Sequence, residues 1–299
     1  MKAINCKKKN ASFTLIELLV VIVIIGILAG VIMISTSSSI DKANLAKAQA
    51  FSKTMQNELL LDLISEWTFD NSNVPVEDTW GNNNGTLSGT TPPIYQSDCI
   101  FGGCYSFSGD DYIGVLDNDT FDTDSITVEA WVKASSSSLV NWATIIAKGN
   151  QGSNHHFWLH YTTATNKFRL ECGDEITRKY ANPVMQELLI NTWYHVVGTY
   201  TPGSMFIYVN GVPGTEQTEL TGKLGTNDYG LTMGKASYIS SYYWSGLIDQ
   251  ARIYKKAFSQ AEVKQNYIAG LDSLLSQGSI SKEDYNQRIN QLAYNEYEK

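Results

Sequence analysis

A run of 17 uncharged, apolar residues from Leu18 to Ile34 constrains this chain more than any other feature. Phe13 to Ile16 extend the run towards the N-terminus, past a single carboxylate, Glu17. A helix over residues 13–34 would be about 33 Å long, which matches the hydrocarbon core of a membrane. Residues 1–12 carry four lysines and no acidic residue. The positive-inside rule therefore predicts a cytoplasmic N-terminus and an extracytoplasmic body.

Two other interpretations of this segment fit less well. A secretory signal peptide has a shorter apolar core and a small-x-small cleavage site, which the stretch from Ser35 to Ser39 does not provide. A plain signal anchor would leave Glu17 without a role, although a carboxylate in a membrane helix costs a few kcal/mol and marks a functional position by default.

The hexapeptide Phe-Thr-Leu-Ile-Glu-Leu at positions 13–18, after a lysine-rich leader, resembles the N-terminus of type IV pilins and of the pseudopilins of type II secretion. The resemblance implies cleavage by a prepilin peptidase between Ser12 and Phe13 and methylation of the new Phe13 amine. Glu17 would pair with the N-terminal amine of a neighbouring subunit, because two buried charges are tolerated when paired. Ser12 stands where the family usually has Gly. The implied location is the bacterial inner membrane and then a surface pilus or pseudopilus.

Helical periodicity continues beyond the apolar run and then gives way to alternation. Apolar residues recur at three- and four-residue steps up to Leu59, so we expect one helix over residues 13–64. From Ser65 to Phe258 at least ten short strands follow one another without interleaved helices, and Asn210-Gly211 predicts a hairpin turn. This pattern predicts an all-β two-sheet sandwich.

The sandwich segment resembles the laminin G-like jelly-roll module of the concanavalin A-like superfamily. The similar segments follow the family's order along the chain: Trp-Thr-Phe-Asp at 67–70, Tyr-Ser-Phe-Ser-Gly-Asp-Asp-Tyr-Ile at 105–113, Ile-Thr-Val-Glu-Ala-Trp-Val at 126–132, Thr-Trp-Tyr-His-Val-Val-Gly-Thr-Tyr at 192–200, Phe-Ile-Tyr-Val-Asn-Gly at 206–211 and Gly-Leu-Ile-Asp-Gln-Ala-Arg-Ile-Tyr at 246–254. Gln250 replaces the usual Glu.

The last residues, 259–299, return to helical spacing. Capping-box patterns at Ser259 and Ser281 predict helices over 259–268 and 282–296. The alternative for the end of this tail is a solvated segment that folds only in part.

Of the four cysteines, Cys6 lies in the leader and Cys172 stands alone. In an oxidising compartment Cys99 and Cys104, five positions apart, are expected to form a disulfide, although two free buried thiols are the alternative. We expect Cys172 to be a buried small apolar residue.

The sequence offers little for catalysis and more for binding. No Glu-x-Asp-x-Glu motif of a retaining glycosidase occurs, and the four histidines lack a zinc pattern, so we expect no enzyme activity. By resemblance, Asp70 and Asp249 are the expected Ca²⁺ ligands where the first and last strands meet, and the loop 78–84 could add oxygens. The alternative is that these aspartates cap turns, which is also our expectation for Asp110 and Asp111.

The net charge of −8 disfavours a nucleic-acid partner. We expect a minor or tip pilin-like subunit that carries a sandwich for adhesion to surface glycans or proteins. Its other partners would be prepilin peptidase, further pilin subunits and the inner membrane. The competing interpretation is a structural major pilin or pseudopilin whose sandwich has no ligand, and a glycan-active enzyme is the remote one.

Overall fold

A computed structural model describes residues 59–97, 99–135, 139–150, 155–174, 176–183, 188–237 and 241–297, together with three residues of the apolar run. Those three, Leu19, Ile22 and Val23, are helical. The expected leader, the Ser12–Phe13 cleavage site and Glu17 lie outside the described residues. Residues 1–57 and 58–299 form two separate compact units, and the account below concerns the second. Among the described residues, no helix is both long and apolar enough for a membrane span.

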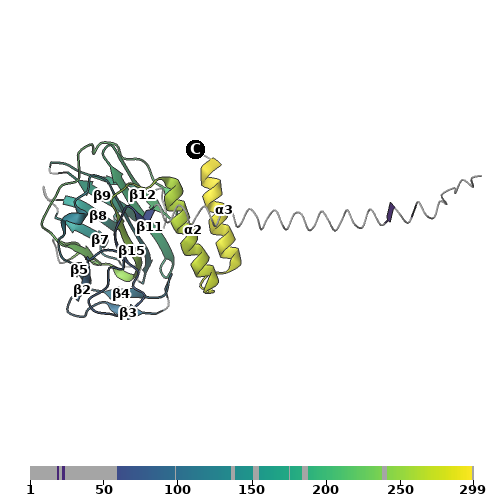
Figure 1. The fold of residues 1–299 in the computed structure, drawn as a ribbon, viewed down its shortest axis with the longest axis horizontal. Helices are drawn as coiled ribbons and strands as arrows, with labels where there is room; N and C mark the ends of the chain where they lie inside the picture. Colours follow the sequence, from purple (N-terminus) through teal and green to yellow (C-terminus); the bar gives the residue numbers. More distant parts are fainter. Residues whose placement is uncertain are drawn as a thin grey trace, which may run out of the picture. The chain divides into compact units, whose positions relative to one another are not determined.

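The second unit is a sandwich of two antiparallel sheets, as the alternation predicted (Figure 1). Sheet A contains eight described strands, ordered β13-β12-β11-β6-β15-β4-β3, with β1 also paired to β15. Its strands are β1 (Leu63–Trp67), β3 (Ile94–Gln96), β4 (Cys104–Ser108), β6 (Ile126–Ala134), β11 (Trp193–Thr201), β12 (Ser204–Val209), β13 (Val212–Pro213) and β15 (Ser245–Tyr254).

Sheet B contains seven described strands in the order β10-β9-β8-β7-β14-β5-β2. Its strands are β2 (Gly85–Ser88), β5 (Tyr112–Val115), β7 (Ala143–Gly149), β8 (His155–Thr162), β9 (Lys167–Gly173), β10 (Arg178–Ala181) and β14 (Leu231–Met233). A short 3-10 helix, η1 (Asp119–Phe121), lies between β5 and β6.

The main core lies between the two sheets and takes alternate residues of each strand. The largest side chains in it include Trp67, Tyr105, Phe157 and Trp244, all at most 1 % exposed. Cys172 is a free, buried thiol in the same core, as expected from the sequence. The predicted hairpin turn at Asn210-Gly211 joins β12 to β13, and both of its residues have positive φ.

Two helices, α2 (Gln260–Ser276) and α3 (Lys282–Tyr297), follow the last strand. In Figure 1 they lie next to each other, beside the part of the sandwich where β11, β12 and β15 are labelled. α2 begins with the predicted capping box, in which Ser259 and Glu262 bond each other's backbone N–H groups. The expectation that this helix ends near residue 268 was wrong, because Gly270 lets α2 pack closely on sheet A and the helix continues to Ser276.

The expected helix to Ile64 was also too long at its C-terminal end. β1 starts at Leu63, and its residues alternate between the two sides of sheet A. Leu63 packs in a cluster with Tyr254 and Phe258, whereas Ile64 packs against the main core. Two consecutive residues that face opposite sides require a strand, whose side chains alternate, and a helix cannot satisfy both contacts.

Candidate functional site

The outer face of sheet B carries an ordered row of aromatic and charged side chains. Strands β8, β9 and β10 send every second residue into the core: Phe157, Leu159, Tyr161, Phe168, Leu170, Cys172 and Ala181. The intervening residues therefore face outwards, because successive side chains of a strand point to opposite faces. Across the strands Trp158 pairs with Glu171, and Glu171 pairs with Tyr180.

Trp158 forms the floor of this row and is held in one orientation. Its indole Nε1 donates to Thr144 Oγ1 at 2.8 Å, so its polar group is satisfied within the protein. Tyr242 stacks on its ring with 5.7 Å between centroids. Thr144 in turn donates its backbone N–H to the Tyr242 carbonyl at 3.0 Å, which fixes Tyr242 beside β7.

Three charged side chains flank the aromatic floor. Arg178 Nε lies 2.6 Å from Glu171 Oε1. The Arg169 guanidinium lies 4.3 Å from the centre of the Tyr180 ring, and its Nε donates to Asn182 Oδ1 at 2.9 Å. Burial raises the pKa of Glu171, against the lowering effect of Arg178 and Arg169.

These residues enclose a hollow of about 200 Å³, which we call the aromatic groove; its lining is Trp142, Trp158, Arg169, Glu171, Arg178 and Tyr180. Trp142 is at its edge with φ of 62°, in the left-handed region that bulky residues rarely adopt. Tyr242 contacts Trp142 edge-on, with 5.0 Å between ring centroids. Residues held in strained backbone conformations cluster at ligand-binding and active sites.

The helices cover part of the outer face of sheet A, around β6 and the neighbouring end of β11. Trp131 in β6 packs against His195 in β11 and Tyr267 in α2, with its ring centroid 5.0 and 5.7 Å from theirs, and the His195 and Tyr267 rings are 6.1 Å apart. Next to this stack Glu129 is fully buried. Its carboxylate accepts from Asn266 of α2 at 3.0 Å, so the helix is tied to the sheet by a charge-assisted hydrogen bond as well as by aromatic packing.

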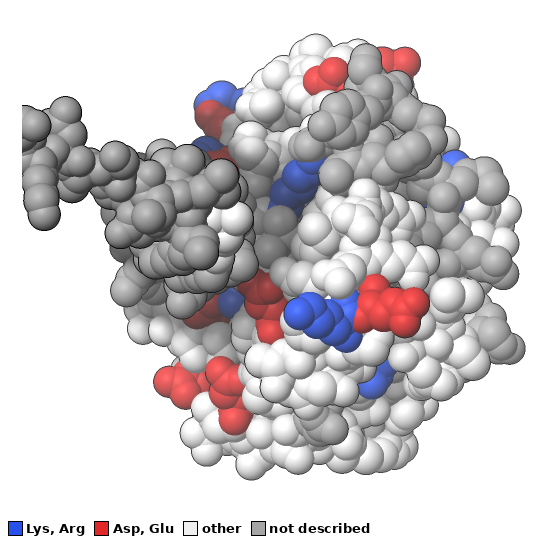
Figure 2. Space-filling model, turned by 90° about the vertical axis from the view of Figure 1, so that its right-hand side faces the viewer, with Lys and Arg blue, Asp and Glu red and all other residues white. Residues whose placement is uncertain are grey.

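A larger hollow of about 680 Å³ lies over β11 and β12, where α2 begins. Two of its charged side chains are already engaged in the fold, because Glu262 caps α2 and pairs with Lys256 at 2.6 Å. On the face drawn in Figure 2, the described Lys, Arg, Asp and Glu side chains form small mixed groups among uncharged residues. Charge therefore does not single out a partner surface on that face.

The family model of the concanavalin A-like lectin/glucanases superfamily matches residues 107–264, more than half of the chain. The chain belongs to this superfamily. A second model, the prokaryotic N-terminal methylation motif, matches residues 7–33, so the protein carries a pilin-type N-terminus ahead of its lectin-like domain. Comparison with curated proteins gives no match.

Solved structures with the same sandwich have low sequence identity and therefore support the fold alone. Domain 4 of AbnA, an extracellular arabinanase of Geobacillus stearothermophilus in complex with arabinotriose, has a TM-score of 0.54 at 20 % identity, covering 68 % of this chain and 97 % of that one. The binding domain of botulinum neurotoxin serotype D has a TM-score of 0.57 at 19 % identity, over 73 % and 53 %. Botulinum neurotoxin type C, whose cell entry depends on two ganglioside molecules, has a TM-score of 0.54 at 17 % identity, over 72 % and 53 %. The chain thus spans about half of the neurotoxin chains.

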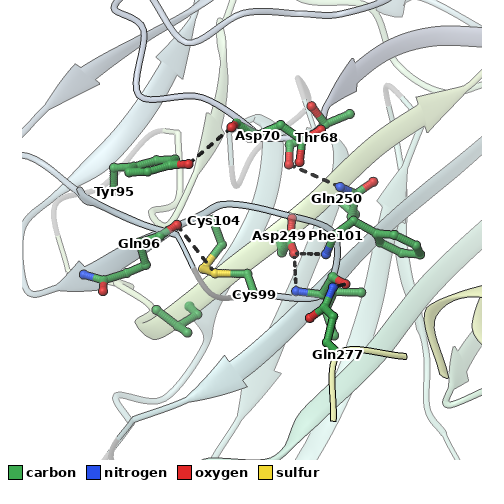
Figure 3. Close-up of a disulfide and its surroundings, with 12 residues drawn as sticks. Thr68, Asp70, Tyr95, Gln96, Cys99, Phe101, Cys104, Asp249, Gln250 and Gln277 are labelled. Atoms are coloured by element: carbon green, nitrogen blue, oxygen red, sulfur yellow. Dashed lines mark hydrogen bonds between the residues drawn. A yellow bond between two sulfur atoms is a disulfide. The ribbon is translucent and has the colours of Figure 1, made fainter. Parts of the chain in front are cut away.

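In this lectin-like domain Cys99 and Cys104 form the expected disulfide, with their Cα atoms 5.8 Å apart. Figure 3 shows that the loop they close lies beside Asp249, Gln250 and Gln277. Asp249 Oδ2 accepts from the backbone N–H of Ile100 at 2.8 Å. Gln277, just after α2, donates to the Ile100 carbonyl at 2.7 Å. The disulfide loop therefore connects the last strand to the C-terminal helices.

Asp249 is buried, and its second carboxylate oxygen has no hydrogen-bond partner among the described residues. Burial raises the pKa of Asp249 to about 7, although the N–H groups of Ile100 and Phe101 act in the opposite direction. Asp70 follows β1 and lies against the other side of the loop: a Cβ on Gly102 would be 2.4 Å from Asp70 Oδ1.

The two expected calcium ligands thus contact one loop, next to the paired strands β1 and β15. An unpartnered buried carboxylate oxygen suits a hard cation, but Ca²⁺ takes six to eight oxygens. The described residues contain no group of three or more His, Cys, Asp or Glu side chains that could hold a metal. Asp70 and Asp249 therefore fit the ion in part, and calcium stays a prediction.

The other aspartates considered from the sequence organise turns. Asp78 accepts four backbone N–H groups, from Glu66, Trp80, Gly81 and Asn83, at 2.9 to 3.1 Å, so it holds its own loop together and ties it to β1. Asp111 accepts from Ser108 N–H across its own turn, as expected, whereas Asp110 accepts from the N–H of Thr90, twenty residues earlier, and so links two turns.

Sequence reasoning missed the aromatic groove. The alternation of β8 and β9 was visible, with Trp158 and His160 at i and i+2 and with Arg169 and Glu171 at the same spacing. That spacing places each pair on one face. Which sheet face stays open depends on where α2 packs, and the strand pattern does not contain that information.

Proposed function

We propose that this protein is a pilin-like subunit, minor or at the tip of its filament, that displays a lectin-like domain for adhesion to a glycan or protein ligand at the cell surface. The methylation motif and the superfamily match support the two halves of this proposal. Prepilin peptidase would cut between Ser12 and Phe13, and Glu17 would pair with the Phe13 amine of a neighbouring subunit. Its location would be the inner membrane before assembly and the cell surface afterwards.

The observation that carries the binding role is the difference between the two outer sheet faces. On sheet A, α2 covers Trp131 and the buried Glu129. On sheet B, the aromatic groove keeps Tyr180 47 % exposed beside two arginines and a glutamate. A hollow with an apolar floor and a few converging polar groups is the usual form of a small-ligand site.

The structural neighbours support a saccharide as the ligand. The arabinanase domain was solved with arabinotriose, and entry of neurotoxin type C depends on gangliosides. We propose binding without catalysis, because the described lining of the groove offers one carboxylate, Glu171, whereas glycoside hydrolysis uses a pair.

The processing step is tested on filaments sheared from cells that express the full chain. Mass spectrometry should find a mature N-terminus at Phe13, with an added methyl group. Peptides that retain Lys7 to Lys9 would contradict cleavage at this position. The variant Glu17→Ala should still enter the membrane but should be missing from filaments, because the neighbouring amine loses its partner.

The binding role is tested on the same cells with Trp142→Ala. Adhesion to a glycan-coated surface should fall at least tenfold, while the amount of the subunit in filaments stays unchanged. If adhesion is unaffected and the subunit dominates the sheared filaments, the protein is a structural major pilin whose sandwich has no ligand.

A further inference from the structure

The aromatic groove has a positive charge balance within an acidic protein. Two guanidinium groups, Arg169 and Arg178, line it together with one carboxylate, Glu171. The whole chain carries a net charge of −8. A locally positive hollow on a negative protein attracts anionic ligands to that one place and repels them elsewhere.

Contacts with neighbouring side chains hold the two arginines in place, with their guanidinium groups lining the groove. Arg169 lies over the Tyr180 ring and bonds Asn182 through Nε, so its position is fixed from two sides. Arg178 is 37 % exposed while it contacts Glu171. A guanidinium has five N–H donors, and the Arg169 hydrogen bond through Nε uses one of them, so Arg169 can still bind a planar anion in a bidentate manner.

The aromatic side chains define the shape that the ligand must have. Trp142 and Tyr180 line the hollow together with the buried Trp158, and Tyr180 is 47 % exposed although Arg169 lies over one face of its ring. Aromatic faces offer apolar area to the C–H face of a sugar ring. The volume of about 200 Å³ is below the ~300 to 1,000 Å³ of drug-sized sites, which suits one ring of a chain.

We propose that the aromatic groove binds an acidic saccharide, with the sugar ring against Trp142 and Tyr180 and its carboxylate or sulfate against Arg169 and Arg178. The inference rests on the proposed adhesive function and specifies its ligand class. Two features support this ligand class together. The positive charge favours an acidic sugar over a neutral one, and the fixed aromatic side chains favour a sugar over an acidic peptide.

The test uses the full chain in detergent on a glycan array that carries uronate, sialate and sulfate glycans with their neutral counterparts and a poly-glutamate peptide. We expect acidic glycans to bind at least tenfold more strongly than their neutral counterparts and the peptide, with binding that weakens as salt rises. Comparison of the uronate, sialate and sulfate arms identifies which acid is recognised.

Three variants locate the site. Arg169→Gln and Tyr180→Ala should each weaken acidic-glycan binding at least tenfold, whereas Arg288→Gln, in α3 far from β9 in the sequence, should leave it unchanged. The melting temperature of each variant is measured beside its binding, and Tyr180→Ala tests the groove without altering its charge if Arg169→Gln fails to fold.

The outcomes separate this inference from the proposed function. Equal binding of neutral and acidic glycans, with loss in Tyr180→Ala alone, overturns the acidic specificity and leaves glycan adhesion standing. Equal binding of poly-glutamate overturns sugar recognition. Absence of binding to every acidic glycan overturns the inference, and absence of binding to every glycan also removes the glycan branch of the proposed function.

Discussion

Gly270 in α2 lies directly against the Trp131 indole in β6: a Cβ on residue 270 would come within 2.0 Å of Cζ2 and 2.6 Å of Cε2. Contacts under 3 Å force atoms to move, and the Trp131 ring is itself held by its contacts with His195 and Tyr267. The missing side chain therefore sets how closely the helix approaches the sheet.

Gly270→Ala should destabilise the domain, although alanine is favoured over glycine in a helix by about 1 kcal/mol. We expect a loss of about 1 to 3 kcal/mol from overpacking. Thermal unfolding measures it, with Ala269→Gly as the control. Helix propensity alone would give the two substitutions opposite signs, whereas close packing at residue 270 makes both destabilising.

The buried carboxylate of Glu129 should make the stability of the domain sensitive to acid. Burial raises its pKa, but the hydrogen bond and charge of His195, the charge of Arg252 and the Asn266 hydrogen bond outweigh burial, so the pKa is about 2. A lowered folded-state pKa contributes stability above the unfolded value of 4.5, and this stability is lost as the pH falls from there towards 2. The contribution at neutral pH is on the order of 3 kcal/mol.

Glu129→Gln should therefore be less stable than the parent at pH 7 and should lose less stability between pH 4.5 and 2. Urea unfolding at several pH values measures both effects. Glu216→Gln is a control on an exposed carboxylate near β12. If the parent and Glu129→Gln lose stability in parallel over this range, the buried carboxylate is not the acid-sensitive group.

Loss of the buried Lys148 ammonium should lower the stability of the domain strongly. It is 1 % exposed and pairs with Asp117, and it also donates to the carbonyls of Asn227 at 3.1 Å and Tyr229 at 2.9 Å. Lys148→Met should cost about 3 kcal/mol, because it leaves a carboxylate and two carbonyls without their donor. Lys223→Met removes an exposed pair with Asp124 and should cost less than about 1 kcal/mol in the same thermal unfolding assay. If the two substitutions lower the stability equally, burial of Lys148 does not explain its contribution.

The calcium prediction concerns Asp70 and Asp249. If both bind the ion, residues 59–299 should gain about 2.7 kcal/mol at a hundredfold excess of calcium over Kd, seen as a melting temperature several degrees higher that chelator reverses. Asp249→Ala should abolish the gain. Asp111→Ala, at a turn-capping position, should lower the melting temperature equally with and without calcium. A parent domain that melts at one temperature in calcium and in chelator has no such site.

The sandwich was predictable from the sequence because strand alternation, turn residues and caps act over a few positions. The disulfide between Cys99 and Cys104 was predictable for the same reason. Which sheet face is covered by a helix could not be predicted from the sequence. Trp131 and Trp158 both point away from the core on alternating strands, and only the path of α2, more than a hundred residues after either, decides that one is buried by a helix and the other forms the floor of a groove.

Gly270 shows a second limit of sequence reasoning. Glycine has low helix propensity, and so a helix end near residue 268 was expected. Contact with Trp131 reverses this preference, because tertiary packing outweighs about 1 kcal/mol of propensity. The roles of Phe13 and Glu17 are a different case, since they depend on neighbouring subunits, and their residues lie outside the described part of the chain.

The pairing of β1 with β15 also has a mechanical consequence. The chain enters the domain at Leu59 and continues into β1, which is joined to β15 from Leu63↔Tyr254 to Trp67↔Ala251. An ion pair of 2.6 Å between Glu66 and Arg252 links the same two strands. Tension applied through the N-terminal segment reaches β1 first and loads its hydrogen bonds to β15. Because β15 also pairs with β6 and β4, the load passes from β1 through β15 into the middle of sheet A. The sandwich therefore resists unfolding under a pulling force as a single unit.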